Sequence, residues 1–539
     1  MSAIKNNMIK NKEYLPVLLL VLTVVSALLI IFSFSSGIYD YDGYDYCEGF
    51  PLAEATLRAG TLINPDYRYY YLIPVGPNVL MAPFVKLFGY TITANRMGML
   101  VYYGMLMAAV WYLSGRLFGD ISDRIMFSAV VNLFVYTYTG DNLLHHLLGY
   151  GIGLVCLMAE LACVMAVGRE RAAAKTYVLL AVCGLWAAVN GEVTAALSSI
   201  PVILAVLYCG YHGNSLKKYR KALIILGCVT LAGMCFYKYL DAVSVSQHMY
   251  DDRFVLDTAG STGSKLFTIF PGDYLKLFFY DPDGESVFSP VGILMLIRLG
   301  VALITLILPF LTVYTEKRHG VYTQAEETEQ IFLYANLIVA AVCLGEYLLV
   351  QTSVLRYLFN MMMALFTLGA WYLTRVMRKV HMPFCRLVLI LFAVLMTGKT
   401  ALMTYPYGKQ LEQRYLDASA LLDRYGLKNG YTFVMFMEPM ELYSNGEHRL
   451  STIGYDEQYD QWHVFDDRVY TEDLFKPVGS DYFFVLTENS YGWEGLQADR
   501  SWHLFSQCRR AVKTKAFSLY IYDIDQWEDV FITEDERYE

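Results

Sequence analysis

The chain consists largely of long apolar runs separated by short polar connections. A helix needs about 20 mostly apolar residues to cross the hydrocarbon core of a bilayer. The pattern predicts eleven membrane-spanning helices, at residues 14–34, 94–115, 125–139, 150–168, 175–190, 193–211, 222–240, 290–314, 330–350, 354–376 and 383–403. Residues 73–88 form a shorter run that contains three prolines, and we expect a helix lying in the membrane interface there.

The basic residues fix an orientation for these helices. With the N-terminus in the cytoplasm, the connections that fall inside carry Lys or Arg, whereas the short outer connections at 140–149, 191–192 and 351–353 carry none. Positive charge is retained on the cytoplasmic side of membrane proteins. The sequence therefore predicts a multi-pass cell-membrane protein whose two long outer loops, at 35–93 and 241–289, lie on the extracytoplasmic side together with the C-terminal segment.

Composition and charge divide the chain in two. Charged residues make up 17 % of the chain, against about 25 % in soluble domains. From residue 405 onward there are 25 Asp and Glu against 13 Lys and Arg, whereas the preceding part is slightly basic. We expect a transmembrane domain at 1–404 and an extracytoplasmic α/β domain at 405–539. The acidic balance disfavours nucleic acid as a partner.

The C-terminal segment has its own pattern of elements. A helix is predicted over residues 409–424, ending near Gly426. Short runs of β-branched and aromatic residues predict strands at 431–437, 449–453, 482–487 and 516–523. A segment of this length can bury a core of its own.

Candidate acids lie just after the first predicted helix. Asp40, Asp42 and Asp45 alternate with tyrosines, a pattern that also suits an interfacial aromatic belt with outward acids. A helix is then predicted over residues 48–59, closed by Gly60 in the position after a helix end.

Three arginines are candidate ligands for an anion. Arg96 and Arg356 stand at predicted helix ends, where interfacial snorkelling is an equal alternative. Arg298 lies about eight residues into a predicted crossing, so its charge must be paired or face an aqueous cavity.

Metal binding has little support in the sequence. His145 and His146 lie beside Asp141, but adjacent histidines rarely bind one ion from a helix, and no zinc-ligand spacing occurs. We therefore predict no metal site, and we expect Cys47 and Cys508, the two cysteines in polar segments, to be free thiols.

Several short motifs, taken in order, resemble the GT-C superfamily. These are integral-membrane glycosyltransferases that use polyprenyl-phosphate sugars, such as protein O-mannosyltransferases and lipid A aminoarabinose transferases. The resemblance is carried by Asp45, Cys47-Glu48, Ala53-Glu54, Leu57, Gly60-Thr61-Leu62, Pro65, Pro74, Pro77, Phe88-Gly89, Ala94-Asn95-Arg96, Asp141-Asn142-Leu143, Arg356-Tyr357, Gly430-Tyr431, Glu441-Leu442-Tyr443-Ser444-Asn445-Gly446 and Trp462.

The resemblance implies a fold, an activity and a set of site residues. It implies a GT-C-like helical membrane domain and transfer of a sugar from a polyprenyl-phosphate donor to an outer-face acceptor, with inversion. Asp45 or Asp42 would act as general base and Asp141 would position a substrate. Arg356, Arg96 and Arg298 would hold the donor phosphate, with Glu48, Glu192 and Tyr357 as substrate contacts. The family's adjacent pair of acids is absent because Tyr46 follows Asp45, so the choice among Asp40, Asp42 and Asp45 stays open.

The chemistry of such a transfer explains why these residue types are needed. A carboxylate activates the acceptor hydroxyl, and cationic side chains stabilise the departing phosphate, so no general acid is required. A divalent cation is an open alternative. The expected partners are the lipid-linked donor, a glycan, lipid or protein acceptor, and membrane lipids.

Two other functions fit the same features. One is a transporter or flippase of lipid-linked saccharides, which predicts charged residues at mid-membrane in several helices. Most acids near the membrane instead cluster at the outer face, and Glu160 is the clearest exception. The other is a non-catalytic cell-envelope assembly protein.

Overall fold

The computed structural model falls into two compact units. Unit 1 comprises Met1–Ile31, Met99–Tyr239 and Met249–Leu402, and unit 2 comprises Phe32–Gly98, Leu240–His248 and Met403–Glu539. The structure describes residues 49–69, 72–145, 149–244, 258–280, 286–319, 327–350, 354–380, 412–456, 461–464, 469–470, 480–488 and 507–532, together with isolated residues outside these ranges.

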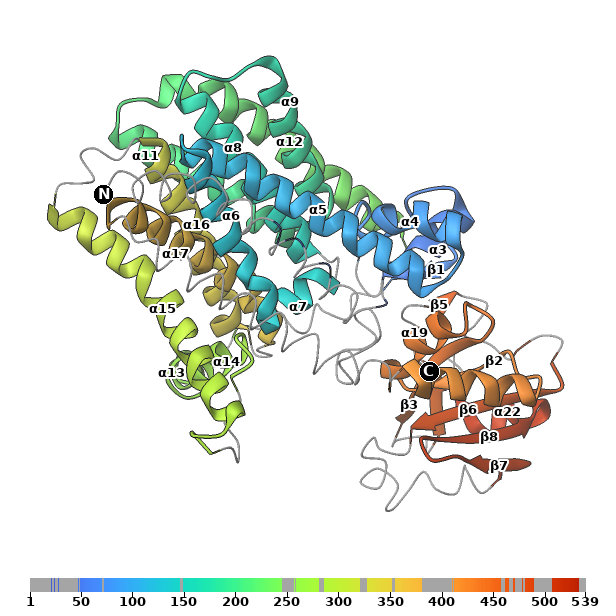
Figure 1. The fold of residues 1–539 in the computed structure, drawn as a ribbon. Helices are drawn as coiled ribbons and strands as arrows, with labels where there is room; N and C mark the ends of the chain where they lie inside the picture. Colours follow the sequence, from blue (N-terminus) through green and yellow to red (C-terminus); the bar gives the residue numbers. More distant parts are fainter. Residues whose placement is uncertain are drawn as a thin grey trace. The chain divides into compact units, whose positions relative to one another are not determined.

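Unit 1 is a bundle of helices (Figure 1). Its helices are α5 (Ile92–Leu117, which begins in unit 2), α6 (Ile121–Asn132), α7 (Tyr138–His145), α8 (Gly149–Gly168), α9 (Ala174–Val189), α10 (Glu192–Ala196), α11 (Ser199–His212), α12 (Leu216–Val243), α13 (Ala259–Ser264), α14 (Phe270–Lys276), α15 (Pro290–His319), α16 (Glu327–Leu349) and α17 (Phe359–Val380). Helix α8 is buried throughout the span Tyr150–Gly168. It packs against α9, α11 and α16, so it forms the centre of the bundle.

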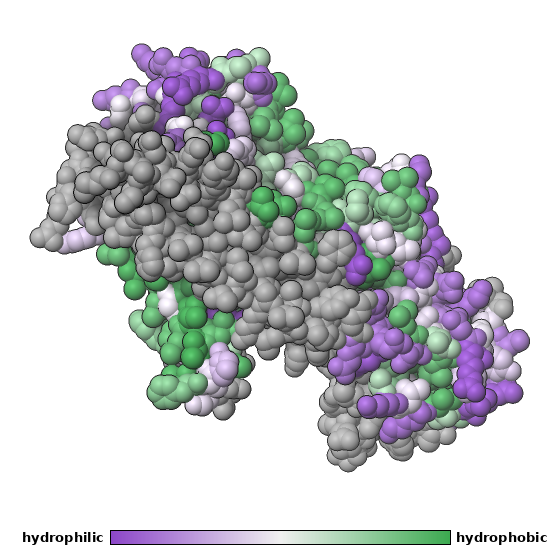
Figure 2. All heavy atoms as spheres, viewed as in Figure 1, coloured by the Kyte–Doolittle hydropathy of each residue, from purple (hydrophilic) through white to green (hydrophobic). Residues whose placement is uncertain are grey.

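Within the described residues, six helices are long and apolar enough to cross a membrane. They are Ile92–Leu117, Tyr150–Gly168, Glu192–His212, Leu216–Val243, Pro290–Leu311 and Glu327–Leu349, and they match six of the predicted spans. Large apolar side chains on α12 and α15, among them Leu231 and Phe310, are exposed. Figure 2 shows hydrophobic residues at the surface of unit 1 and many hydrophilic ones over the C-terminal sheet. Apolar surface of this extent is covered by lipid, so the protein is embedded in a membrane.

The predicted crossing at residues 125–139 is not a single helix. The stretch is divided among α6, the 3-10 helix η1 (Leu133–Tyr136) and the start of α7. The 12 residues of α6 span only ~18 Å. Polar side chains interrupt the apolar run at the helix ends. Asn132 accepts a hydrogen bond from Tyr103, and Thr137 donates one to the Phe134 carbonyl.

Of the other predicted spans, two are helical and two lie almost wholly outside the described residues. Residues 354–376 are helical, as the 3-10 helix η5 (Leu355–Leu358) followed by α17, and residues 175–190 correspond to α9. The predicted spans at 14–34 and 383–403 lie outside the described residues, apart from Val21, Val24 and Leu28, which are helical.

Among the described residues that precede Gly98, unit 2 contains the short helices α3 and α4. Helix α3 (Gly49–Ala59) confirms the helix predicted after the first membrane run, and Gly60 follows it with φ +66°. The Gly60 amide bonds the Thr56 carbonyl at 3.0 Å, which closes the helix in a conformation that glycine adopts without strain. Helix α4 (Pro77–Phe88) accounts for the short proline-containing run. Its position in the membrane interface stays a prediction.

The remainder of unit 2 is built on a mixed sheet. Its strands are β2 (Asn429–Thr432), β3 (Arg449–Asp456), β4 (Gln461–Val464), β6 (Tyr482–Glu488), β7 (Arg510–Lys513), β8 (Phe517–Asp523) and β9 (Phe531–Ile532). In the described residues these strands lie in the order β7-β8-β6-β2-β3-β4-β9, with β2 parallel to both β3 and β6. Helix α19 (Val434–Tyr443), the short helix α22 (Trp527–Val530) and a helix over residues 412–424 complete the α/β arrangement seen in Figure 1. The last of these confirms the helix predicted over residues 409–424.

Both faces of the sheet are buried. Along β6, Phe484 and Leu486 point into one apolar core with Met440 of α19, whereas Phe483 and Val485 point into a second core with Trp527 of α22. Successive strand residues face opposite sides of a sheet, so each core receives alternate residues. The strands predicted at 449–453, 482–487 and 516–523 are confirmed as β3, β6 and β8.

The strand predicted at residues 431–437 is mostly wrong. Strand β2 ends at Thr432, and the apolar residues that follow form α19. A short apolar run has no periodicity that separates a buried strand from a buried helix. The packing of α19 against β3 decides for the helix here.

The long loop predicted at residues 35–93 and the C-terminal sheet domain belong to the same unit. The two-residue strand β1 (Tyr67–Arg68) pairs antiparallel with β5 (Val469–Tyr470). The Arg449 guanidinium of β3 bonds the Glu54 carboxylate of α3 at 3.2 Å. The first loop is therefore structured by contacts with residues about 400 positions later in the chain.

Candidate functional site

The acids predicted as the catalytic group precede the described part of unit 2. Asp40, Asp42, Asp45 and Glu48 all lie outside the described residues. Cys47, two positions after Asp45, is described and buried. The surroundings of Cys47 therefore define the environment into which the chain enters α3.

A buried carboxylate from the C-terminal domain lies near Cys47. Glu438 of α19 is fully buried. Burial raises the pKa of the Cys47 thiol well above its usual value, and the Glu438 carboxylate raises it further. Neither residue's partner could be foreseen from the sequence, because the two are almost 400 positions apart.

Arg96 reaches the same neighbourhood. The buried ring of Tyr443 is stacked on Tyr415, with ring centroids 5.3 Å apart and an interplanar angle of 2°. Burial raises the pKa of Tyr443, Cys47 raises it further, and the charge of Arg96 lowers it. The first turn of α5 thus brings one predicted phosphate-binding arginine towards the start of α3, within unit 2.

Tyr90 joins this region to more carboxylates. Its hydroxyl donates to Glu441 Oε2 at 3.4 Å, and its ring lies 5.2 Å from that of Phe50. Burial, followed by the charges of Glu441, Glu54 and Glu438, raises the pKa of Tyr90 well above its usual value. Carboxylates from α3 and α19 thus lie near Tyr90, close to the start of α3.

A second cluster forms in unit 1 around Arg356. Arg356 is half-buried in η5, directly before α17. Its charge interacts with Glu346 near the end of α16 and with Tyr150 at the start of α8. The start of α8 and the end of α16 thus lie close to the Arg356 guanidinium of η5.

Side chains beside Arg356 are packed and hydrogen-bonded to the start of α8. Tyr357 is buried and also interacts with Tyr150. The Asn360 side-chain amide donates to the Tyr150 carbonyl at 3.1 Å. The predicted substrate contact Tyr357 and the predicted phosphate ligand Arg356 therefore lie in one packed region.

Helix α7, which carries Asp141, packs against this region. The ring of Tyr138 contacts that of Phe359 at 6.0 Å and that of Phe279 at 5.6 Å, both edge-to-face. Phe359 is the first residue of α17, immediately after η5. Asp141 therefore lies about one helical turn after Tyr138, whose ring packs beside the Arg356 cluster.

Arg298 borders the same aromatic group from α15. Its guanidinium donates to the Phe279 carbonyl at 2.9 Å and lies 5.4 Å from the Phe279 ring centroid. The charge of this arginine within a crossing is thus held by a backbone oxygen and an aromatic face.

The sequence analysis missed three charged residues at this end of unit 1. Lys265 is buried and its amine donates to the Val350 carbonyl at 2.6 Å. The second is Asp273 of α14, whose Oδ2 accepts a hydrogen bond from the Tyr347 hydroxyl at 2.7 Å. Glu346 is the third, and it had a detectable signal, because an acid inside an apolar run is costly and needs a partner.

The fold as a whole has counterparts among solved structures. Crystal structures of ArnT from Cupriavidus metallidurans, bound to undecaprenyl phosphate and in the apo state, match with TM-scores of 0.56 and 0.54 at 12 % and 14 % identity. Each match covers 93 % of this chain and 97 % of ArnT. ArnT is a GT-C glycosyltransferase. This chain has the GT-C fold.

Other comparisons add less. An oligosaccharyltransferase of Archaeoglobus fulgidus matches at 13 % identity over 87 % of this chain and 68 % of that one, with a TM-score of 0.44, too low to bear on the assignment. No protein-family model and no curated protein matches the sequence. The GT-C fold is thus established by the arrangement of the helices and the C-terminal domain along nearly the whole chain.

Two further acids can be placed within the GT-C fold. Glu192, the first residue of α10, forms an ion pair with Lys238 of α12 at 2.6 Å. Glu160 is fully buried in α8 and accepts a hydrogen bond from the Ser199 hydroxyl at 2.8 Å. Both acids have partners within the bundle, which explains how the helices tolerate them.

Within the described ranges, no group of three or more His, Cys, Asp or Glu side chains is placed to hold a metal ion. The side chain of His145 and all of His146 lie outside what the structure describes. Cys47 and Cys508 are free thiols, as predicted.

Proposed function

We propose that this chain is a glycosyltransferase that moves a sugar from a polyprenyl-phosphate donor to an acceptor on the extracytoplasmic face, with inversion. The observation that carries the proposal is the arrangement around Arg356, where a half-buried guanidinium lies at the meeting point of α8, α16 and η5. A similarly folded protein, ArnT, has been crystallised with undecaprenyl phosphate. A donor of this class needs both an apolar path for the lipid and a cation for its phosphate.

The reaction assigns a task to each group. The acceptor hydroxyl attacks the anomeric carbon while the bond from that carbon to the phosphate oxygen breaks. The electron pair leaves on the phosphate, and the hydroxyl proton passes to the carboxylate of Asp45, or of Asp42 in its place. We assign Asp141 to positioning a substrate.

The positive charges act on the leaving group. Arg356 is the proposed principal phosphate ligand, with Arg96 and Arg298 as further cations and Tyr357, Glu48 and Glu192 as substrate contacts. Glu346 keeps the Arg356 guanidinium oriented and lowers the cost of burying it before the donor binds.

The first test measures donor binding. The full chain is reconstituted in nanodiscs and titrated with undecaprenyl phosphate. We expect Arg356→Ala to weaken binding by about tenfold or more, because charge-assisted hydrogen bonds contribute ~1.5–3 kcal/mol.

Arg375→Ala is the matched control for this variant. Arg375 lies on α17, which follows η5 directly, and it pairs with Glu329 of α16 at 3.0 Å. We expect this variant to bind the lipid as the wild type does. Equal affinity of the Arg356→Ala variant and the wild type would contradict the proposed phosphate site.

The second test measures transfer itself. Membranes of the cell that makes the protein supply the acceptor. The donor is a radiolabelled undecaprenyl-phosphate sugar, and the released undecaprenyl phosphate is measured. We expect Asp45→Asn to lower the rate by about 100-fold or more, as loss of a general base does. If this variant keeps the wild-type rate, Asp45 is not the base; if the wild type releases no lipid phosphate, the chain is not a transferase of this donor.

A further inference from the structure

A hollow of about 670 Å³ lies in unit 2 between the turn that follows α3 and strand β5. It is lined by Arg58, Ala59, Thr61, Asn64, Pro65, Asp66 and Tyr470. The antiparallel pairing of β1 with β5 places Tyr470 opposite Tyr67 and holds the two walls together. None of these residues has a role in the proposed transfer step.

Tyr470 forms one wall of the hollow and is an unusual buried residue. Only 7 % of its surface is exposed, and within the described residues its hydroxyl has no hydrogen-bond partner. The Arg58 guanidinium lies 4.2 Å from its ring centroid, and the Tyr67 ring lies 5.1 Å away. A buried hydroxyl without a partner is costly, so a group that enters the hollow and bonds it would gain that energy.

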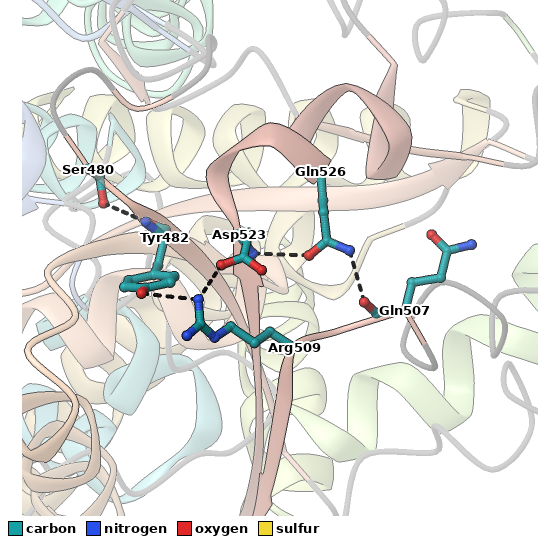
Figure 3. Close-up of polar contacts among 6 residues, drawn as sticks. All are labelled: Ser480, Tyr482, Gln507, Arg509, Asp523 and Gln526. Atoms are coloured by element: carbon teal, nitrogen blue, oxygen red, sulfur yellow. Dashed lines mark hydrogen bonds and ion pairs between the residues drawn. The ribbon is translucent and has the colours of Figure 1, made fainter.

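A second arginine–tyrosine pair in the same domain provides a contrast. Arg509 lies 4.9 Å from the ring of Tyr482, and its guanidinium also donates to the Tyr482 hydroxyl at 3.1 Å and to Asp523 at 2.6 Å (Figure 3). That pair is exposed and satisfies its polar groups internally. The Tyr470 hydroxyl, in contrast, has no hydrogen-bond partner within the described residues, and Tyr470 lines the hollow.

The other wall is pre-formed. The Asn64 side chain donates to the Ala55 carbonyl at 3.2 Å and accepts a bond from the Asp66 amide at 2.9 Å. The backbone amide of Asn64 in turn donates to the Tyr69 hydroxyl at 2.8 Å. These bonds fix the turn that carries Asp66, so a ligand meets an ordered surface and little conformational entropy is lost on binding.

The lining indicates the chemistry of the ligand. A lipid chain needs an apolar cavity, and this one has charges of both signs. An anion would be attracted by Arg58 but repelled by Asp66. Sugar hydroxyls donate to a carboxylate and accept from a guanidinium or a tyrosine hydroxyl, so a neutral saccharide suits all three side chains.

We propose that this hollow is a saccharide-binding subsite, separate from the transfer site, which holds part of a glycan acceptor. The assignment of the saccharide as acceptor rests on the proposed transferase function, whereas the binding itself does not. The subsite joins the first outer loop to the C-terminal domain, which gives that domain a role in selecting the acceptor.

Saturation-transfer NMR on the full chain tests this subsite. The protein is reconstituted in nanodiscs free of sugar-based detergent, and the probes are three neutral tetrasaccharides: maltotetraose, cellotetraose and chitotetraose. We expect at least one to receive saturation from the wild type. Arg58→Ala should weaken its binding by about tenfold or more. Asp66→Asn, a change of nearly equal size, and Tyr470→Phe should each weaken it as well.

Arg509→Ala is the control, because it removes an arginine from a tyrosine ring in the same domain without touching the hollow. We expect this variant to bind as the wild type does, and the thermal midpoint of every variant shows whether it is folded. The proposal is overturned if no probe binds the wild type, if folded Arg58→Ala, Asp66→Asn and Tyr470→Phe proteins all bind normally, or if Arg509→Ala loses binding equally. Donor lipid is absent from this experiment, so its outcome does not depend on transfer. A wild type that binds a saccharide here but releases no lipid phosphate in the transfer assay would contradict only the transferase function.

Discussion

At the scale of single residues, burial decides the chemistry of the first outer loop. Cys47 stands in a polar stretch of the sequence, yet its thiol is buried beside Glu438. A neighbouring negative charge and the loss of water both disfavour the thiolate. The same burial that holds Cys47 in place therefore makes it chemically inert.

This inertness can be measured by alkylation. Because its pKa is raised, less of the Cys47 thiol is ionised at any given pH, and only the thiolate reacts. We expect iodoacetamide to leave Cys47 unmodified in the native full chain at about pH 8, with the rate still rising above about pH 9. Peptide mass spectrometry measures the modified fraction.

An introduced exposed thiol provides the comparison. Lys515 is exposed in the C-terminal domain, so the cysteine of a Lys515→Cys variant should react within the range typical of free thiols. Modification of Cys47 at the same rate as this residue would contradict its burial beside Glu438.

At the scale of elements, close packing in the C-terminal sheet depends on a position without a side chain. Gly430 lies in β2, and a Cβ atom there would stand 2.4 Å from the Phe484 ring on β6. A real Cβ atom does not approach a ring so closely, so the ring or the strand would have to move. The aromatic core on that face of the sheet thus requires glycine at this position.

We expect Gly430→Ala to destabilise the C-terminal domain by about 1–3 kcal/mol, the usual cost of overpacking a core. Thermal unfolding of the full chain, followed by proteolysis of the C-terminal domain, measures the loss. Asn429→Ala is the control, because Asn429 is exposed in the same strand. A Gly430→Ala protein as resistant as the wild type would show that β2 and β6 are not packed as described.

At the scale of the whole molecule, the orientation in the membrane is the central prediction. The helices identify a membrane protein, whereas the side on which each loop lies follows from the distribution of Lys and Arg. The proposed function requires the first outer loop, the Arg356 cluster and the C-terminal domain on the same, extracytoplasmic side.

Labelling of intact cells tests this orientation. A membrane-impermeant maleimide should modify Lys515→Cys in the C-terminal domain and leave Lys217→Cys untouched until the cells are opened. Lys217 is exposed at the start of α12, in a connection predicted to be cytoplasmic. The opposite pattern would exclude an outer-face transferase with this topology.

The sequence by itself determined the features that depend on local pattern. Apolar runs of about 20 residues gave the spans, because a bilayer requires that length. Gly60 marked the end of α3, because its φ of +66° suits glycine. Ordered motifs gave the GT-C resemblance that the fold comparison supports.

Only the tertiary structure decided what depends on contacts between distant residues. Three contacts join segments whose local sequences do not indicate their partners. They are the pairing of β1 with β5, the approach of Glu438 to Cys47, and the cluster of Arg356 with Glu346 and Tyr150. The same holds for α19, whose apolar residues suit a strand equally well until they pack on the sheet. Hydrophobic periodicity predicts which side chains face the core. Which residues they contact there depends on how the whole chain packs.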